Sequence, residues 1–174
     1  LITPWNFPLM IAAWKIAPAL AMGNTVVLKP ASVTPLTALA FGDLCLEAGV
    51  PAGVFNVLPG SGALAGPALV QHPLVRKISL TGSTAVGTQV MKLAADGIKR
   101  VSLELGGKSA NIIFADANLD SCLESSLWSV YDNAGQDCCS RSRFLIERKI
   151  YDEFVARFVA RVKTLRVGDT ADEK

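Results

Sequence analysis

Cys138 is the side chain in this sequence most suited to nucleophilic chemistry. It follows Gly135 and Gln136, just after a stretch with helical periodicity, and a glycine there permits a tight, exposed turn. A thiolate on such a turn can add to a carbonyl carbon. The alternative is that Cys138 is a buried structural thiol. Without a partner residue, the cysteine alone favours this structural role over a catalytic one. Cys45 and Cys122 fall within helical patterns and are predicted to be small core residues.

Metal binding is not predicted for these thiols. Cys138 and Cys139 are adjacent, which is not the spacing of metal ligands, and the single histidine, His72, lies in a turn far from other reactive groups. Four unevenly spaced cysteines are also too few for a disulfide framework. They indicate free thiols in a reducing compartment, and we expect a cytoplasmic protein.

Three more polar side chains stand in apolar or rigid surroundings. Glu104 interrupts the strand-like run 101–105, where it could act as a general base or could face water from an edge strand. Asn6, between two prolines at the start of a helical pattern, could donate to an oxyanion or act as the helix N-cap. Lys15 lies in a largely apolar helix, where burial would lower its pKa unless its stem reaches water.

Two strand-to-helix turns have features that suit a phosphate. Gly82 and Ser83 follow the strand-like run 77–80 and precede a helical stretch, whose first N–H groups would point at an anion. A second glycine cluster, residues 60–66, precedes another helix. Neither has the G-x-G-x-x-G spacing, so ordinary turns are the alternative.

Lys29 ends a third strand, where it could face a ligand crevice or cap the strand at the surface.

Short β-branched runs alternate along the chain with longer stretches of helical periodicity. Such alternation predicts an α/β fold with a parallel sheet and helices on both faces. Runs such as 111–114 are apolar throughout, which is expected for strands buried on both faces. The predicted strands are 25–28, 54–58, 77–80, 101–105, 111–114 and 144–147. The predicted helices are 8–22, 35–48, 62–71, 84–95, 119–134 and 151–165.

Composition excludes several classes of protein. The 174 residues are 51% hydrophobic and 18% charged, so the chain can bury a core and is not disordered. A net charge of +2 gives no electrostatic case for nucleic acid or an anionic membrane as a partner. The uncharged stretch 48–75 contains four prolines and is not expected to span a membrane. The chain opens on Leu1 in mid-pattern without a signal peptide, and we expect it to be a piece of a longer protein.

Five motifs in this order make the chain resemble the aldehyde dehydrogenase superfamily over essentially its whole length. They are PWNFP at 4–8, LKP at 28–30, TGSTAVG at 81–87, LELGG at 103–107 and GQDC at 135–138. The resemblance implies oxidation of an aldehyde to a carboxylic acid with NAD or NADP. It implies that Cys138 is the nucleophile and that the Asn6 amide and the Cys138 N–H hold the oxyanion. It also implies that Glu104 activates water as a general base and that Lys15 assists proton movement.

The same resemblance implies a variant Rossmann arrangement, which accommodates a Gly-Ser turn without the usual glycine fingerprint. Lys29 would bind the adenosine ribose, and Ser83 would contact the pyrophosphate. Ser32 stands where strictly NAD-preferring members often carry a glutamate. A serine hydroxyl can accept the 2′-phosphate of NADP, so the choice of dinucleotide stays open. The implied cofactor residues are Thr3, Trp5, Lys29, Ser32, Gly62, Gly66, Gly82, Ser83 and Leu105.

On the family pattern, residues 1–105 are part of the dinucleotide-binding domain, and residues 106–174 begin a second α/β domain, the catalytic one. The fragment alone is not expected to be active, and its parent is expected to be a homo-oligomer that acts on a small aldehyde. Asp132 and Asp137 either line the substrate channel, which would favour a polar or cationic aldehyde, or face solvent. The alternative functions are a CoA-acylating aldehyde dehydrogenase, which generally lacks the Glu104 base, and a nucleotide-binding member without catalysis.

Overall fold

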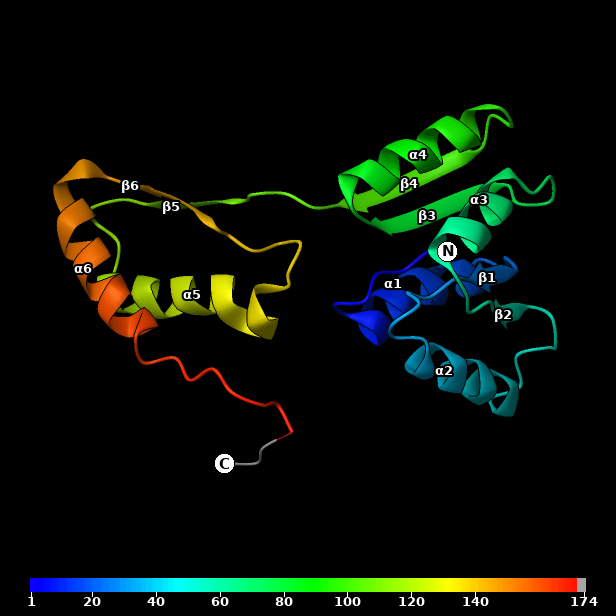
Figure 1. Cartoon of the computed structure of the whole chain (residues 1–174), viewed down its shortest axis with the longest axis horizontal. Coiled ribbons are helices and arrows are strands. Elements are labelled where there is room, and N and C mark those ends of the chain that lie inside the picture. The colour runs from blue at the N-terminus through cyan, green and yellow to red at the C-terminus, as the bar shows by residue number, and fades with distance from the viewer. Residues whose placement is uncertain (172–174) are drawn as a thin grey trace. The chain divides into compact units, whose positions relative to one another are not determined.

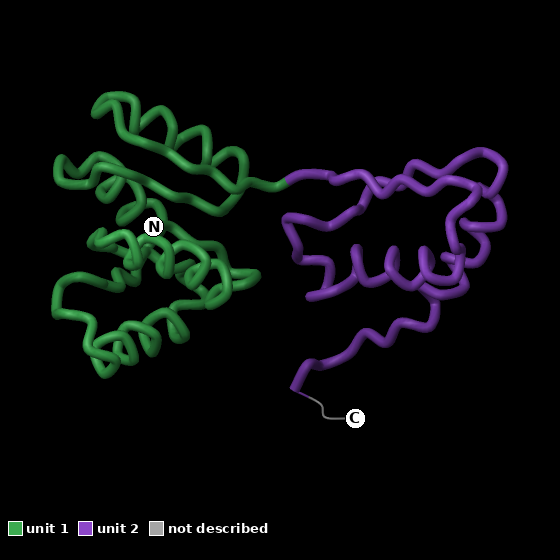
Figure 2. Tube along the Cα trace, turned by 180° about the vertical axis from the view of Figure 1, so that it is seen from behind, with its two compact units in different colours: residues 1–106 green, residues 107–174 purple. Residues whose placement is uncertain are grey.

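The computed structural model describes residues 1–171, and the chain divides into two compact units, unit 1 (Leu1–Gly106) and unit 2 (Gly107–Lys174) (Figure 2). Helices and parallel strands occur in both units (Figure 1). The predicted α/β fold with parallel strands is therefore confirmed. The assignment of unit 1 to the dinucleotide and of unit 2 to the nucleophile stays a prediction.

The elements of unit 1 follow the predicted alternation closely, and two of the helices have the predicted bounds. In chain order they are α1 (Pro8–Ala21), β1 (Val26–Leu28), α2 (Leu36–Glu47), β2 (Phe55–Val57), α3 (Gly62–Gln71), β3 (Lys77–Gly82), α4 (Thr84–Ala95) and β4 (Arg100–Leu105).

The strands of unit 1 form one parallel arrangement through the first residues of the chain. β1 pairs with β2, and β3 pairs with β4, both in parallel. Between β1 and β3, Ile2 forms parallel bridges to Lys29 and to Leu80. The Ile2 N–H donates to Ser79 O at 2.9 Å, and the Thr3 N–H donates to Lys29 O at 3.1 Å. The order across unit 1 is therefore β2, β1, the Ile2 segment, β3 and β4.

Helices cover both faces of this arrangement, as the alternating pattern predicts. On β3, Ile78 and Leu80 point into a cluster with α3 and α4, whereas Ser79 between them contacts Lys15 of α1. A second cluster joins α1 and α2 to β1 and β2. Full burial of a leucine such as Leu80 stabilises the fold by about 1.5–3 kcal/mol. The buried members are Val70, Ile78, Leu80, Val90 and Ala94 in the first cluster and Ala12, Ile16, Val26, Leu28, Ala38, Cys45 and Phe55 in the second.

Gly87 lies where α4 passes close to β4. A Cβ built there would come within 2.7 Å of Leu105 Cδ2 and 3.1 Å of Cδ1, so a side chain at this position requires Leu105 to shift from its packing on the core cluster. We expect Gly87→Val to lower the free energy of unfolding by about 1–3 kcal/mol, measured by urea denaturation. Gly66→Val in α3 is the matched control, because nothing lies within 4 Å of its Cβ position. Equal effects in the two variants would contradict the role of the Leu105 contact.

Unit 2 is a parallel strand pair covered by two helices. Its elements are β5 (Ala110–Ile113), α5 (Leu119–Tyr131), η1 (Asp132–Gly135), β6 (Arg143–Ile146), η2 (Arg148–Ile150) and α6 (Tyr151–Val162), where η marks a turn of 3-10 helix. β5 pairs with β6 in parallel. Arg157 of α6 forms an ion pair with Asp120 of α5, but both side chains are exposed and the pair adds little stability. The core consists of Ile113, Leu123, Ile150 and Phe154.

The helix predicted for 119–134 is too long. α5 ends at Tyr131, because Asn133 and Ala134 adopt left-handed conformations, with φ of 50° and 57°, that stop helical hydrogen bonding. The helix predicted for 151–165 likewise ends three residues early, at Val162. Within residues 1–171, no helix combines the length and the apolar character needed to cross a bilayer.

The interpretation of 111–114 as a strand buried on both faces is wrong. Ile113 points into the core and is 3% exposed, but Ile112 is 59% exposed and Phe114 is 62% exposed. Successive strand residues point to opposite faces, so only the face that carries Ile113 is covered by α5 and α6 within the described residues.

Candidate functional site

Lys29 lies directly after β1 and is buried. Its Nζ donates a hydrogen bond to the Pro30 carbonyl oxygen at 2.8 Å, and the residue is only 4% exposed, so the alternative of a surface cap is wrong. Burial lowers the pKa of Lys29, because apolar surroundings disfavour the charged form. A Cβ built on Gly62, the first residue of α3, would lie 3.8 Å from this Nζ. The structure therefore brings Lys29 and Gly62 together at the carboxyl ends of β1 and β2.

Ser32, in the loop after β1, also lies at the carboxyl ends of β1 and β2. Its Oγ donates a hydrogen bond to the Gly60 carbonyl oxygen at 2.9 Å, and its side chain is exposed. Gly60 has a φ of 144°, a conformation that residues with a Cβ rarely adopt. Gly66 lies four residues after Gly62 in α3, on the same side of the helix. We call Lys29, Ser32, Gly60 and Gly62 the edge cluster.

Gly82 and Ser83 lie at the end of the next strand. β3 continues to Gly82, two residues further than the sequence predicts, and Ser83 is the N-cap of α4. The Ser83 Oγ accepts a hydrogen bond from the Val86 N–H at 3.3 Å, which is the role expected of an ordinary strand-to-helix turn. The hydroxyl hydrogen is not used in that bond, so Ser83 can still donate to an anion in front of the helix.

Thr3 carries a buried hydroxyl without a hydrogen-bond partner in the described structure. The residue lies between β1 and β3 and is 4% exposed. A buried polar group left unpaired costs about 1–3 kcal/mol, so Thr3 suits a ligand that supplies the missing bond. Trp5, two residues further on, is half exposed. Leu105, by contrast, packs its side chain on the core cluster of α3, α4 and β3.

Lys15 and Glu104 lie close enough on unit 1 to interact electrostatically. Burial lowers the pKa of Lys15, and the neighbouring Glu104 carboxylate offsets part of that shift. Glu104 lies on β4 opposite Thr81 of β3 and is exposed, so the water-facing alternative describes its position. The Lys15 Nζ also donates a hydrogen bond to Ser79 Oγ at 2.8 Å. Ser79 is the residue that sequence reasoning missed, although its hydroxyl interrupts the apolar strand 77–80 and alternation places it beside Thr81.

Asn6 lies in the segment that leads from Thr3 into α1. The helix begins at Pro8 and its N-cap is Phe7, so the alternative that Asn6 is the N-cap is wrong. The residue is half-buried. Its role as an oxyanion donor stays a prediction.

Cys138 lies on a turn in the segment between η1 and β6 of unit 2. It is half-buried rather than part of the core, so the alternative of a buried structural thiol is wrong. Its Sγ lies 3.8 Å from the Sγ of Cys139, which is exposed. The prediction that Cys45 is a core residue is confirmed, and Cys122 packs at the margin of the unit 2 core. Gly135, with a φ of 74°, forms part of the turn that precedes the two thiols.

The two aspartates near Cys138 make local turn contacts. Asp132 Oδ1 accepts a hydrogen bond from the Asn133 N–H at 2.9 Å, and Asp132 is exposed. Asp137 Oδ1 accepts from the Cys139 N–H at 3.0 Å and is half-buried. The solvent-facing alternative therefore holds for Asp132, whereas Asp137 orders the turn that carries the thiols.

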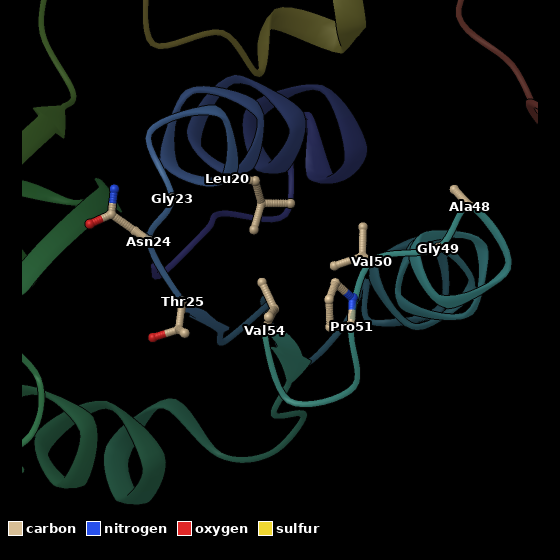
Figure 3. Close-up of a pocket in the computed structure, with 9 residues that line it drawn as sticks. All are labelled: Leu20, Gly23, Asn24, Thr25, Ala48, Gly49, Val50, Pro51 and Val54. Carbon is tan, nitrogen blue, oxygen red and sulfur yellow. The ribbon is translucent and has the colours of Figure 1, made fainter.

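Two surface hollows lie at the opposite edge of unit 1, at the amino ends of the strands. One, of about 440 Å³, is shown in Figure 3; it is lined by residues at the ends of α1 and α2 and before β1 and β2. The other, of about 820 Å³, lies before β3 and β4. Ligands of parallel α/β sheets bind at the carboxyl ends of the strands, so neither hollow is the candidate site. The residues of the first hollow are Leu20, Gly23, Asn24, Thr25, Ala48, Gly49, Val50, Pro51 and Val54.

Comparison with known proteins identifies the family that the five sequence motifs indicated, and the match extends over the whole chain. The sequence profile described as the aldehyde dehydrogenase family matches residues 1–174. Cytosolic 10-formyltetrahydrofolate dehydrogenase from Pongo abelii is 55% identical over 173 residues, which are 99% of this chain and 19% of that protein. The chain therefore spans about a fifth of the length of that relative.

Solved structures agree in fold as well as in sequence. PnpE from Pseudomonas sp. WBC-3, solved in complex with nicotinamide adenine dinucleotide, is 48% identical with a TM-score of 0.94, covering 98% of this chain and 35% of PnpE. A structure titled as an E. coli NADP dependent enzyme is 49% identical with a TM-score of 0.95, covering 99% of this chain and 36% of that one. The chain belongs to the aldehyde dehydrogenase family.

Proposed function

We propose that the full-length protein oxidises an aldehyde to a carboxylic acid with NAD or NADP, through a covalent intermediate on Cys138. The observation that carries the proposal is the order of the five motifs within a chain that belongs to the family over its whole length. The family includes relatives named as dehydrogenases and structures titled as NAD-bound or NADP-dependent. We also propose a homo-oligomer in the cytosol; the relative from Pongo abelii is named cytosolic.

The residues of unit 1 fit a dinucleotide. The unpaired Thr3 hydroxyl, the buried Lys29 ammonium and the hydroxyls of Ser32 and Ser83 are donors or acceptors at the carboxyl ends of β1 and β3. Gly62 leaves space beside the Lys29 Nζ. We propose that Lys29 and Ser32 hold the adenosine ribose and that Ser83, with the first N–H groups of α4, holds the pyrophosphate. When bound, the nicotinamide supplies the hydride acceptor of the reaction.

The chain's own residues would carry the covalent steps. The Cys138 thiolate adds to the aldehyde carbon and forms a thiohemiacetal, while the Asn6 amide and the Cys138 N–H donate to the oxyanion. Loss of hydride from that carbon leaves a thioester. Glu104 then takes a proton from water, the hydroxide attacks the thioester carbon, and the acid leaves as the thiolate is restored.

Lys15 is proposed to exchange protons with Glu104, and Ser79 holds it in place. We expect Ser79→Ala to lower kcat about tenfold, because one hydrogen bond to a charged group is lost. The pKa of Lys15 should fall further without this acceptor, so the alkaline limb of the kcat profile should move to lower pH. Ser79→Thr keeps the hydroxyl and should restore both values. If kcat falls in both variants and the pH profile does not change, Ser79 has only a packing role.

Ser32 allows a direct test of the dinucleotide site. We expect Ser32→Glu to raise the KM for NADP at least about tenfold, because a carboxylate would face the 2′-phosphate, and to leave the KM for NAD within about threefold. Ser32→Gln, similar in size but neutral, is the matched control and should affect the two cofactors alike. If Ser32→Glu and Ser32→Gln change the KM for NADP equally, Ser32 does not lie near the 2′-phosphate of NADP.

Product analysis of the full-length protein tests the proposed function itself. A panel of aldehydes is assayed with NAD and with NADP, each with and without CoA. We expect carboxylic acid to form without CoA. Acyl-CoA formation that requires CoA would favour the CoA-acylating alternative, and cofactor binding without turnover of any aldehyde would favour the non-catalytic one.

A further inference from the structure

Cys139 is a second thiol beside the proposed nucleophile, and the proposed reaction does not use it. The Sγ atoms of Cys138 and Cys139 are 3.8 Å apart, and Cys139 is the more exposed of the two. Cys45 and Cys122 lie in helices instead. Residues 138 and 139 form a turn outside the helices and strands, so their backbone is not fixed by an element.

The distance between the two sulfurs is within reach of a covalent bond. A disulfide requires an S–S separation of about 2.05 Å, so the sulfurs must approach by less than about 2 Å. The Cys139 N–H donates a local hydrogen bond to Asp137 Oδ1 at 3.0 Å. The preceding residues, Asn133 to Gly135, already lie in left-handed conformations outside α5. Because the two cysteines are adjacent, their Cα atoms lie about 3.8 Å apart, closer than the usual separation of about 4.4–6.8 Å in a disulfide, so the bond is strained and easily reduced.

We propose that Cys139 is a resolving thiol, which captures oxidised Cys138 in a reversible disulfide and prevents its further oxidation. The Cys138 thiolate attacks one oxygen of a peroxide, the O–O bond breaks, and a sulfenic acid and water (from hydrogen peroxide) are formed. The Cys139 sulfur then attacks the sulfenic sulfur, the S–O bond breaks, and a second water leaves. Overall, two thiols lose two hydrogen atoms and the peroxide is reduced. A dithiol reductant reverses the bond.

The inference rests on the proposed function only for the statement that oxidation of Cys138 stops turnover. The disulfide itself requires no aldehyde chemistry. Its formation is read from the mass of the peptide that contains both cysteines, so the two proposals can fail separately.

The experiment treats the full-length protein with hydrogen peroxide, with Cys139→Ser and Cys45→Ser in parallel. For the unchanged protein and Cys45→Ser, we expect the peptide to lose the mass of two hydrogens and activity to return with dithiothreitol. Cys139→Ser should have normal activity before treatment, but its peptide should gain oxygen and its activity should not return.

Three results would overturn the proposal. One is oxygen addition at Cys138 of the unchanged protein to the same extent as in Cys139→Ser. Another is a disulfide between two chains, seen as a dimer on a non-reducing gel. The third is full recovery of Cys139→Ser with dithiothreitol after the same exposure. If the disulfide forms but no aldehyde is oxidised by untreated protein, only the proposed function is contradicted.

Discussion

Cys138→Ser in the full-length protein is expected to lower the rate of aldehyde oxidation by roughly 10⁴-fold or more, while the Kd for the dinucleotide stays within about threefold. A serine hydroxyl at neutral pH is a far weaker nucleophile than a thiolate. The edge cluster, which is proposed to bind the cofactor, lies in unit 1 and is unchanged by the substitution. Steady-state kinetics and a dinucleotide titration measure the two quantities.

Cys139→Ser is the matched control for this prediction. It removes the same atom type at the neighbouring position of the same turn, and its rate is expected to equal that of the unchanged protein. Loss of activity in Cys139→Ser, with Cys138→Ser still active, would move the nucleophile to Cys139. Equal activity in all three proteins would contradict a covalent cysteine mechanism.

Glu104→Gln is expected to lower kcat by about 10²–10³-fold through a block after hydride transfer. The glutamine cannot take a proton from water, so the thioester on Cys138 should accumulate. Rapid mixing should show a burst of reduced dinucleotide approaching one per active site, followed by slow turnover. Glu47→Gln, an exposed glutamate at the end of α2, is the control and should leave both phases unchanged. A variant without the burst would show that Glu104 acts before hydride transfer.

The helices and strands of unit 1 were predicted well, because the residues that begin and end them are unambiguous sequence signals. α3 and α4 have the predicted bounds: α3 begins after Gly60 and Ser61, and α4 begins at the Ser83 cap. Unit 2 was less predictable, because α5 is ended by left-handed Asn133 and Ala134. The αL region is rare for residues with a Cβ, and alanine gives no sequence signal for it.

For the candidate site, the sequence places Lys29 directly after a strand, and ligand residues gather at the carboxyl ends of parallel strands. The structure buries Lys29 at that position, but its role in binding stays a prediction. The Lys15–Ser79 contact could not be predicted, because it depends on which face of β3 receives α1. The concerted roles of Asn6, Glu104 and Cys138 come from the family resemblance and stay a prediction.

The Ile2 segment has a consequence for the precision of the proposed chemistry. Its main chain is hydrogen-bonded to strand residues on both flanks, and four residues later the chain reaches Asn6. We expect an amide donor four residues from a backbone held on both sides to move less than one at the tip of a surface loop. A dipole kept stationary before charge develops needs no reorganisation when the carbonyl oxygen becomes negative, and such electrostatic preorganisation is a large part of catalysis.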